Sequence, residues 1–261
     1  TAFPRVTESM GIVFTPVEVV DFIIHSVDWA LNKYFGKSLA SKNVHILDPF
    51  TGTGTFITRT LYYLKQQMDE GKITYDDILR KYMHELHANE IVLLSYYIAA
   101  INIEAVFDEI NGPDHGYKPF EGIVLTDTFE STERQNTLDD DMFGENDKRL
   151  KKQQEVPITA IISNPPYSVG QKNANDNNQN IHYPKLEEQI EETYVAESTS
   201  NLSKSSYDSY IKAFRWASDR IGKQGVIGFV TNGSYLDSNS TDGLRASLYK
   251  EFNHLYIYNL R

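Results

Sequence analysis

The residues best suited to chemistry are Asn164, Pro165, Pro166 and Tyr167, which directly follow an apolar run at 159–163. Proline fixes its own φ, has no N–H to donate, and disfavours a helical conformation in the residue before it. We therefore expect a stiff rim at a strand end, with one amide, free carbonyl oxygens and an aromatic face. Such a rim could hold the NH2 group of a flat ligand. The alternative, a proline-rich turn, is weaker, since this tetrapeptide should occur by chance in on the order of one in a thousand such chains.

A second candidate for ligand binding is the glycine loop that follows the predicted strand at 44–47. Asp48 opens this loop, Gly52 and Gly54 lie within it, and a predicted helix at 57–67 follows. The order strand, glycine loop, helix brings backbone and a helix N-terminus close to a ligand. The loop lacks the third glycine of the dinucleotide fingerprint and the lysine of a P-loop. We therefore expect no phosphate here; the acid of Asp48 suits a cationic or hydroxyl-rich ligand.

Two further acids close predicted strands. Glu90 follows the run at 83–89, and Asp127 follows the run at 122–126. An acid at the tip of the second strand of an α/β sheet can bind a ribose diol. It can equally be a carboxylate that stabilises the N-terminus of the next helix. For Glu90 these two interpretations are evenly balanced.

Thr15 and Pro16 mark the start of a predicted helix at 17–33. Threonine is a good N-cap, and proline is favoured at the first helical position. Taken alone, this pair favours a helix start over a binding function.

The elements that must position these residues alternate between strands and helices. The predicted strands are 44–47, 83–89, 122–126, 159–163, 225–230 and 255–260. The predicted helices are 17–33, 57–67, 75–81, 91–103, 207–221 and 241–252. This alternation predicts an α/β fold with a doubly wound, mostly parallel, Rossmann-like sheet and helices on both faces. Because ligands bind at the carboxyl ends of parallel strands, we expect Asp48, Glu90, Asp127 and Asn164 at one edge.

We expect one domain, residues 1–261, with an N-terminal helical segment at 1–40. Residues 130–156 are rich in charge, which predicts a solvated loop with one exposed helix. Residues 168–206 form a long polar insertion with an amphipathic stretch at 186–195. Long loops of this kind are usually lids or binding loops.

Composition limits the class of protein. The chain has 261 residues, is 40% hydrophobic and 23% charged, and contains no cysteine. Disulfides and cysteine metal sites are therefore excluded, and we expect no metal site. No signal sequence or membrane-length apolar run occurs, which predicts a cytoplasmic protein. The net charge of −11 argues against tight duplex-DNA binding by this chain alone. Its ends, Thr1 and Arg261, suggest a piece of a longer polypeptide.

Taken together and in order, these motifs resemble those of S-adenosylmethionine-dependent N6-adenine DNA methyltransferases of the γ motif order, found in restriction–modification systems. The matching segments are Phe14-Thr15-Pro16, Asp48 to Gly54, Glu90, Asp127-Thr128-Phe129 and Asn164-Pro165-Pro166-Tyr167. The glycine loop and the polar region after Tyr167 are most similar to the methylase part of large single-chain restriction enzymes with helicase and nuclease regions.

The resemblance implies a cofactor, S-adenosyl-L-methionine, and assigns residues to it. Thr15 and the glycine loop would hold its methionine part, Glu90 its ribose hydroxyls and Asp127 its adenine. The full implied cofactor set is Phe14, Thr15, Asp48, Pro49, Gly52, Gly54, Glu90, Asp127 and Phe129. Asn164 and the Pro165 carbonyl would receive the target amine, and Tyr167 would stack on an adenine flipped out of DNA.

The implied partner is duplex DNA, recognised through a target-recognition domain that lies outside this chain. Two alternatives stay open. One is a methyltransferase that acts on protein glutamine or on ribosomal-RNA amino groups, since both present an NH2 on a planar group. The other is an inactive fragment that binds cofactor or DNA. The Phe14-Thr15-Pro16 segment and the long insertion favour DNA.

Overall fold

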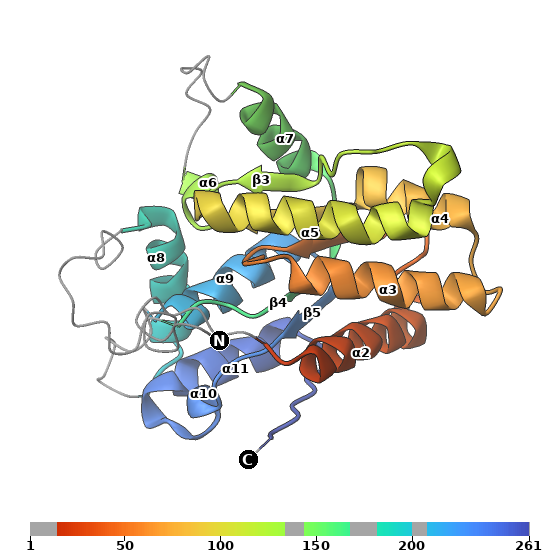
Figure 1. Ribbon diagram of the computed structural model, residues 1–261. Coiled ribbons are helices and arrows are strands. Elements are labelled where there is room, and N and C mark those ends of the chain that lie inside the picture. The colour runs from red at the N-terminus through yellow and green to blue at the C-terminus, as the bar shows by residue number, and fades with distance from the viewer. Residues whose placement is uncertain (1–14, 134–143, 168–181, 200–207, 261) are drawn as a thin grey trace.

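A five-stranded parallel sheet forms the centre of the protein, which is seen here as a computed structural model (Figure 1). The structure describes residues 15–133, 144–167, 182–199 and 208–260. The strand order is β3-β2-β1-β4-β5. The strands are β1 (His45–Asp48), β2 (Leu86–Glu90), β3 (Ile123–Leu125), β4 (Ile158–Ser163) and β5 (Val226–Phe229). From β1 the chain adds β2 and β3 on one side of the sheet and then returns to add β4 and β5 on the other side of β1. This reversal of strand order confirms the predicted doubly wound fold.

Helices cover both faces of the sheet, and alternate strand residues reach opposite cores. Ile46 and Ile162 are buried in one core, whereas Leu47 and Ile161 are buried in the other. This is the period of two that a strand imposes on its side chains. The first core is covered by α2 (Val17–Phe35), α3 (Thr55–Asp69) and α5 (Leu93–Asn111), which lie side by side in Figure 1. The second is covered by α8 (Pro184–Ile190), α9 (Ser209–Ile221) and α11 (Asp242–Glu251).

Shorter elements connect these layers. They are α4 (Tyr75–Arg80), η1 (Lys81–Glu85), η2 (Pro113–His115), α6 (Glu130–Glu133), α7 (Gly144–Glu155), η3 (Glu191–Val195), α10 (Ser234–Asp237) and η5 (Asn239–Thr241). The single exposed helix predicted within 130–156 corresponds to α7, and the amphipathic stretch predicted at 186–195 corresponds to α8 and η3. Over the described ranges, no helix combines the length and apolar character that a bilayer crossing requires.

The predicted start of the second strand at Met83 is wrong, because the chain stays helical through Glu85. The reason is the buried cation of Lys81. Its Nζ lies 2.7 Å from a carboxylate oxygen of Glu85 and donates to the carbonyls of Ser41 and Val44, each at 2.6 Å. This pairing within one helical turn holds η1 until Leu86.

The predicted sixth strand at 255–260 is also wrong, because this segment has no strand pairing in the described sheet. Its aromatic rings instead contact the outer face of α2. The Tyr256 ring lies 5.4 Å from that of Trp29, and the Tyr258 ring lies 5.0 Å from that of Phe22. The apolar run that suggested a strand therefore makes ring contacts with a helix.

Thr15 does not cap α2 as predicted. The helix begins at Val17 with Pro16 as its N-cap, and no side chain bonds the first turn. The hydroxyl of Thr15 is available to another segment because it lies one residue farther from the helix. The N-terminal prediction for Phe14 lies outside the described residues.

Candidate active site

The polar residues predicted at strand ends do meet at one edge of the sheet. Asp48 and Glu90 are the last residues of β1 and β2, Asp127 follows β3 by two residues, and Asn164 directly follows β4. All four strands are parallel, so their carboxyl ends share one edge. The direction reversal between β1 and β4 places Asp48 and Asn164 on neighbouring strands, where α/β sheets open a binding crevice.

Asp48 is fully buried and has one oxygen without a partner. Its Oδ1 accepts from Ser163 Oγ at 2.6 Å and from the Phe50 N–H at 3.2 Å. Its Oδ2 has no hydrogen-bond partner among the described residues. Burial raises the pKa of this carboxyl to about 7. A buried acceptor oxygen left open in this way suits a cationic donor, which is the ligand type that the glycine loop predicted.

Glu90 fastens the glycine loop to the helix that follows. One carboxylate oxygen accepts from the Gly52 N–H at 2.7 Å, and the other accepts from the Val92 N–H at 2.8 Å. Burial raises the pKa of Glu90. The same carboxylate therefore bonds the residue that precedes α5 and the glycine loop, and its binding of a ribose stays a prediction.

The two loop glycines have different tasks. Gly52 has φ +57° and open space where a Cβ would lie, so it supplies the turn that presents its N–H. Gly54 has φ +90°, and a Cβ there would approach Ala99 Cα and Ile103 Cγ1 of α5 at 3.3 and 3.2 Å. Gly54 thus allows the loop to pack closely on α5, whereas Gly52 borders open space.

Asp127 is held by backbone and by a residue that sequence reasoning missed. Its Oδ1 accepts from the Phe129 N–H at 2.9 Å, and its Oδ2 accepts from the Tyr183 hydroxyl at 2.7 Å. Next to it, the Thr128 hydroxyl donates to the Pro49 carbonyl at 2.6 Å, which joins this loop to the glycine loop. No local pattern could have identified Tyr183, since it lies 56 residues from Asp127.

Asn164 is fixed from both ends of its amide. Its Nδ2 donates to the Thr15 hydroxyl at 2.9 Å, across 149 residues of sequence. The Tyr167 hydroxyl lies 2.9 Å from Asn164 Oδ1 and 3.1 Å from the Val230 carbonyl, and its one proton is shared between these acceptors. Burial raises the pKa of Tyr167 to about 12, so its hydroxyl remains a donor at neutral pH. No described residue donates to the Pro165 carbonyl.

Ser163 is a second residue that the sequence analysis missed. It ends β4, directly before Asn164, and its hydroxyl reaches the carboxylate at the end of β1. The available signal was a polar residue that closes an otherwise apolar strand. Through Ser163 the two neighbouring strand ends are bonded to each other, so the amide rim and the buried carboxylate form one site.

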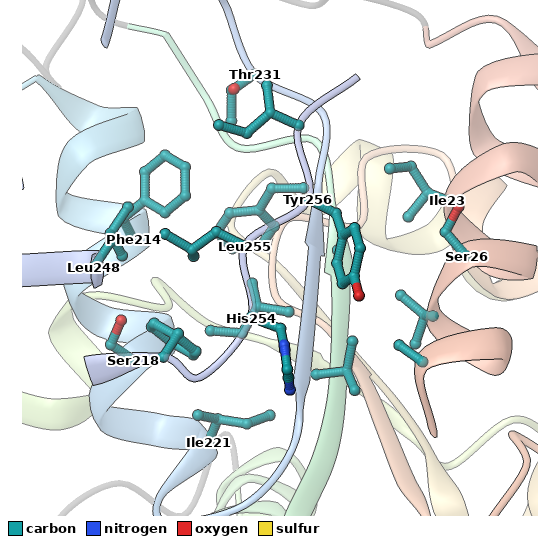
Figure 2. Close-up of a pocket in the computed structure, with 18 of the residues that line it drawn as sticks. Ile23, Ser26, Phe214, Ser218, Ile221, Thr231, Leu248, His254, Leu255 and Tyr256 are labelled. Carbon is teal, nitrogen blue, oxygen red and sulfur yellow. The ribbon is translucent and has the colours of Figure 1, made fainter. Parts of the chain in front are cut away.

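A cavity of about 1740 Å³ lies elsewhere, between α2, α9, α11, β5 and the segment at 253–260. Figure 2 shows Leu255 and Tyr256 projecting to opposite sides of that segment, with Tyr256 directed toward α2. Among its described lining residues is none of the residues predicted for the site. The cavity therefore contains none of the polar strand-end groups, although Val230, whose carbonyl accepts from the Tyr167 hydroxyl, lines it.

Comparisons with known proteins found a family model and similar solved structures. The family model described as N-6 DNA Methylase matches residues 2–253 of the chain. The comparison with curated proteins gave no match.

Three solved structures are similar over nearly the whole chain. A nuclease-deletion mutant of the Type ISP restriction-modification enzyme LlaGI, in complex with a DNA substrate mimic, is 72% identical with a TM-score of 0.90, over 93% of this chain and 20% of that chain. The ATP-dependent Type ISP restriction-modification enzyme LlaBIII bound to DNA is 66% identical with a TM-score of 0.88, over 95% of this chain and 16% of that chain. A DrdV–DNA complex is 43% identical with a TM-score of 0.84, over 96% of this chain and 23% of that chain. The chain thus spans less than a quarter of the length of each.

Proposed function

The chain belongs to the N-6 DNA methylase family, which confirms the resemblance that its motifs predicted, and from this membership we propose the reaction of its site. We propose that the chain transfers a methyl group from S-adenosylmethionine to N6 of an adenine flipped out of duplex DNA, within a restriction–modification enzyme. The observation that carries the proposal is the 2.6 Å bond from Ser163 to Asp48. It joins the strand that ends in the amine-accepting rim to the strand that ends in the open carboxylate.

The cofactor side of the site fits the chemistry of the donor. When bound, S-adenosylmethionine supplies an electrophilic methyl group on a sulfonium centre. The open Oδ2 of Asp48 is placed to accept from an ammonium group, and the Glu90 carboxylate can accept from ribose hydroxyls. Asp127 can accept from the adenine amine, with Phe129 and Pro49 as packing neighbours.

The acceptor side orients the attacking amine. Asn164 Oδ1 keeps a lone pair beyond its bond from Tyr167, and no donor to the Pro165 carbonyl lies among the described residues, so two acceptors can receive the hydrogens of an NH2 group. Two acceptors favour a pyramidal nitrogen, which frees the lone pair that ring delocalisation otherwise withdraws. The bond from Asn164 Nδ2 to the Thr15 hydroxyl fixes which side of the amide carries the oxygen. Catalysis of this kind is positioning and charge placement, without a general base.

The remaining parts of the proposal concern the polypeptide beyond this chain. The DNA sequence would be read by a target-recognition domain, and helicase and nuclease regions would accompany the methylase. This is supported by the similarity to LlaGI, a Type ISP restriction-modification enzyme, and to LlaBIII, an ATP-dependent enzyme of the same type. Methylation of protein glutamine or ribosomal RNA has less support, because the three similar structures are DNA complexes.

The test is transfer of a labelled methyl group from S-adenosylmethionine to duplex DNA, RNA and protein in parallel. It should be run with this chain and with the longest natural polypeptide that contains it. We expect label in DNA alone, recovered as N6-methyladenine after digestion. Label confined to RNA or protein would overturn the DNA assignment, and the Asn164→Ala variant supplies the background rate.

A further inference from the structure

Tyr183 opens the helix that follows the acceptor rim, yet its hydroxyl lies on the opposite side of the site. It is the N-cap residue of α8, is 8% exposed, and donates to Asp127 Oδ2 at 2.7 Å. Burial and the neighbouring carboxylate raise the pKa of this phenol, so it stays a donor at neutral pH. A residue of the insertion therefore bonds the acid that would read the cofactor adenine.

The hydroxyl completes the fixation of the Asp127 carboxylate. Oδ1 already accepts from the N–H groups of Phe129 at 2.9 Å and Glu130 at 3.4 Å. The bond from Tyr183 to Oδ2 removes the remaining rotation of the carboxylate about its own axis. Each carboxylate oxygen can accept two hydrogen bonds, so Oδ2 keeps one acceptor position for a ligand amine.

The helix that carries Tyr183 is itself anchored to the same loop. The two carboxylate oxygens of Glu133 in α6 accept from the N–H groups of Lys185 at 3.1 Å and Leu186 at 3.0 Å. On the other side, Lys212 of α9 donates to Glu187 at 2.9 Å. The first turn of α8 is thus held between α6 and α9.

The ring of Tyr183 is placed as firmly as its hydroxyl. Its centroid lies 5.3 Å from that of Phe129 in an edge contact, and Lys212 Nζ lies 5.0 Å from the ring centroid. Phe129 is one of the residues that would pack on the cofactor adenine. The ring and the hydroxyl of Tyr183 therefore each contact a residue that would bind the cofactor adenine.

We propose that Tyr183 is a positioning residue for the cofactor adenine, one that holds Asp127 in the orientation that accepts from the exocyclic amine. The inference rests on the proposed function, in which Asp127 reads that amine. It adds a specificity role for the insertion after the acceptor rim: preference for adenine over a purine that has no 6-amino group.

The experiment compares two ligands that differ at that group. S-adenosylhomocysteine and S-inosylhomocysteine would be titrated calorimetrically into the wild-type protein, Tyr183→Phe and Tyr194→Phe. The phenylalanine at 183 keeps the ring and removes the hydroxyl. The matched control, Tyr194→Phe, removes a buried tyrosine hydroxyl in η3, and this hydroxyl does not bond Asp127.

We expect the wild-type preference for the adenosyl ligand to fall about tenfold in Tyr183→Phe, the effect of one hydrogen bond. Binding of the inosyl ligand should stay within about twofold, and Tyr194→Phe should keep the wild-type preference. An unchanged preference in Tyr183→Phe would overturn the positioning role and leave the proposed function intact. Tighter adenosyl binding in that variant would also overturn it, because the hydroxyl would then compete with the ligand. Failure of the wild type to bind either ligand would overturn both.

Discussion

Two parts of the site differ in how far their hydrogen bonds depend on backbone donors. In the cofactor half (Asp48, Glu90 and Asp127), each carboxylate accepts from at least one backbone N–H group, and side-chain hydroxyls add a bond at Asp48 and at Asp127. In the acceptor half (Asn164, Pro165 and Tyr167), the Asn164 amide bonds two side-chain hydroxyls, those of Thr15 and Tyr167. A backbone N–H group survives most substitutions, whereas a side-chain hydroxyl is lost with one. Loss of one hydroxyl should therefore leave each carboxylate of the cofactor half with a backbone donor, but it leaves the Asn164 amide with a single partner among the described residues.

The largest effect is expected for Asn164→Ala, which removes the amide acceptor from the acceptor half. Methyl transfer to DNA should fall about a thousandfold, the upper range for loss of one group that stabilises charge in a transition state. Binding of S-adenosylhomocysteine, measured calorimetrically, should change less than about twofold. An equal loss of cofactor binding would show that the two halves are not separate. Asn32→Ala, at an exposed position of α2, is the matched control.

Glu90→Ala tests the other half. It removes a carboxylate that holds Gly52 and Val92 and that would accept from the ribose. A hydrogen bond to a charged group contributes about 1.5–3 kcal/mol of free energy, so cofactor affinity should fall about a hundredfold. At saturating cofactor the rate of transfer should recover to within about tenfold of wild type. A loss of rate that saturating cofactor does not restore would show that Glu90 does more than bind the cofactor.

Two substitutions of Tyr167 distinguish the contribution of its ring from that of its hydroxyl. Tyr167→Ala should lower methyl transfer about fiftyfold, because stacking on a base contributes strongly to its binding. Tyr167→Phe keeps the ring and removes the bond shared by Asn164 and Val230. It should lower transfer about tenfold at most. Equal losses in the two variants, measured as single-turnover rates, would mean that the hydroxyl rather than the ring is what matters.

Asp48 predicts a pH dependence of cofactor binding. Burial raises its pKa to about 7, so the carboxyl of the free protein is mostly protonated at lower pH and must lose its proton to bind an ammonium group. Affinity for S-adenosylhomocysteine should therefore rise about fivefold from pH 6 to pH 7 and level off above. Asp48→Asn should bind more weakly and with a flat profile. A flat wild-type profile over this window would contradict an ammonium contact at Asp48.

The raised pKa of Asp48 also makes the free energy of unfolding depend on pH, in the opposite direction to cofactor affinity. A carboxyl whose folded pKa lies above its unfolded value stabilises the fold at low pH. That contribution is lost as the pH rises from about 4 through about 7. Cofactor should offset this loss, because it favours the ionised form. Thermal unfolding with and without S-adenosylhomocysteine at several pH values would measure the difference.

Thr15→Val should give the smallest effect in the acceptor half. It removes the hydroxyl that receives the Asn164 amide, and one such bond corresponds to about a fivefold loss of transfer rate. Thr15→Ser keeps the hydroxyl and should stay near wild type. If Thr15→Val kept the transfer rate of Thr15→Ser, the Asn164 amide would be oriented by something other than the Thr15 hydroxyl. Rates should be compared at saturating cofactor.

Prediction from the sequence succeeded where the physical cause was local. Asp48, Glu90 and Asn164 lie at or directly after strand ends as expected, because an apolar run followed by a turn signal marks the end of a buried strand. Prediction failed where distant segments decided the outcome. The bonds from buried Lys81 to the distant carbonyls of Ser41 and Val44 help to keep residues 81–85 helical, and ring contacts with α2 replace strand pairing at residues 255–260.

The sequence by itself determined the alternation of strands and helices, the family, and the carboxylates and amide that end the strands. These depend on side-chain periodicity and turn chemistry within a few residues. The tertiary structure alone decided which hydroxyls hold those groups: Thr15 for Asn164 across 149 residues, Ser163 for Asp48 across 115, and Tyr183 for Asp127 across 56. A hydrogen bond requires its two atoms within about 3 Å. Only packing of the elements against one sheet brings residues so far apart in sequence to that distance.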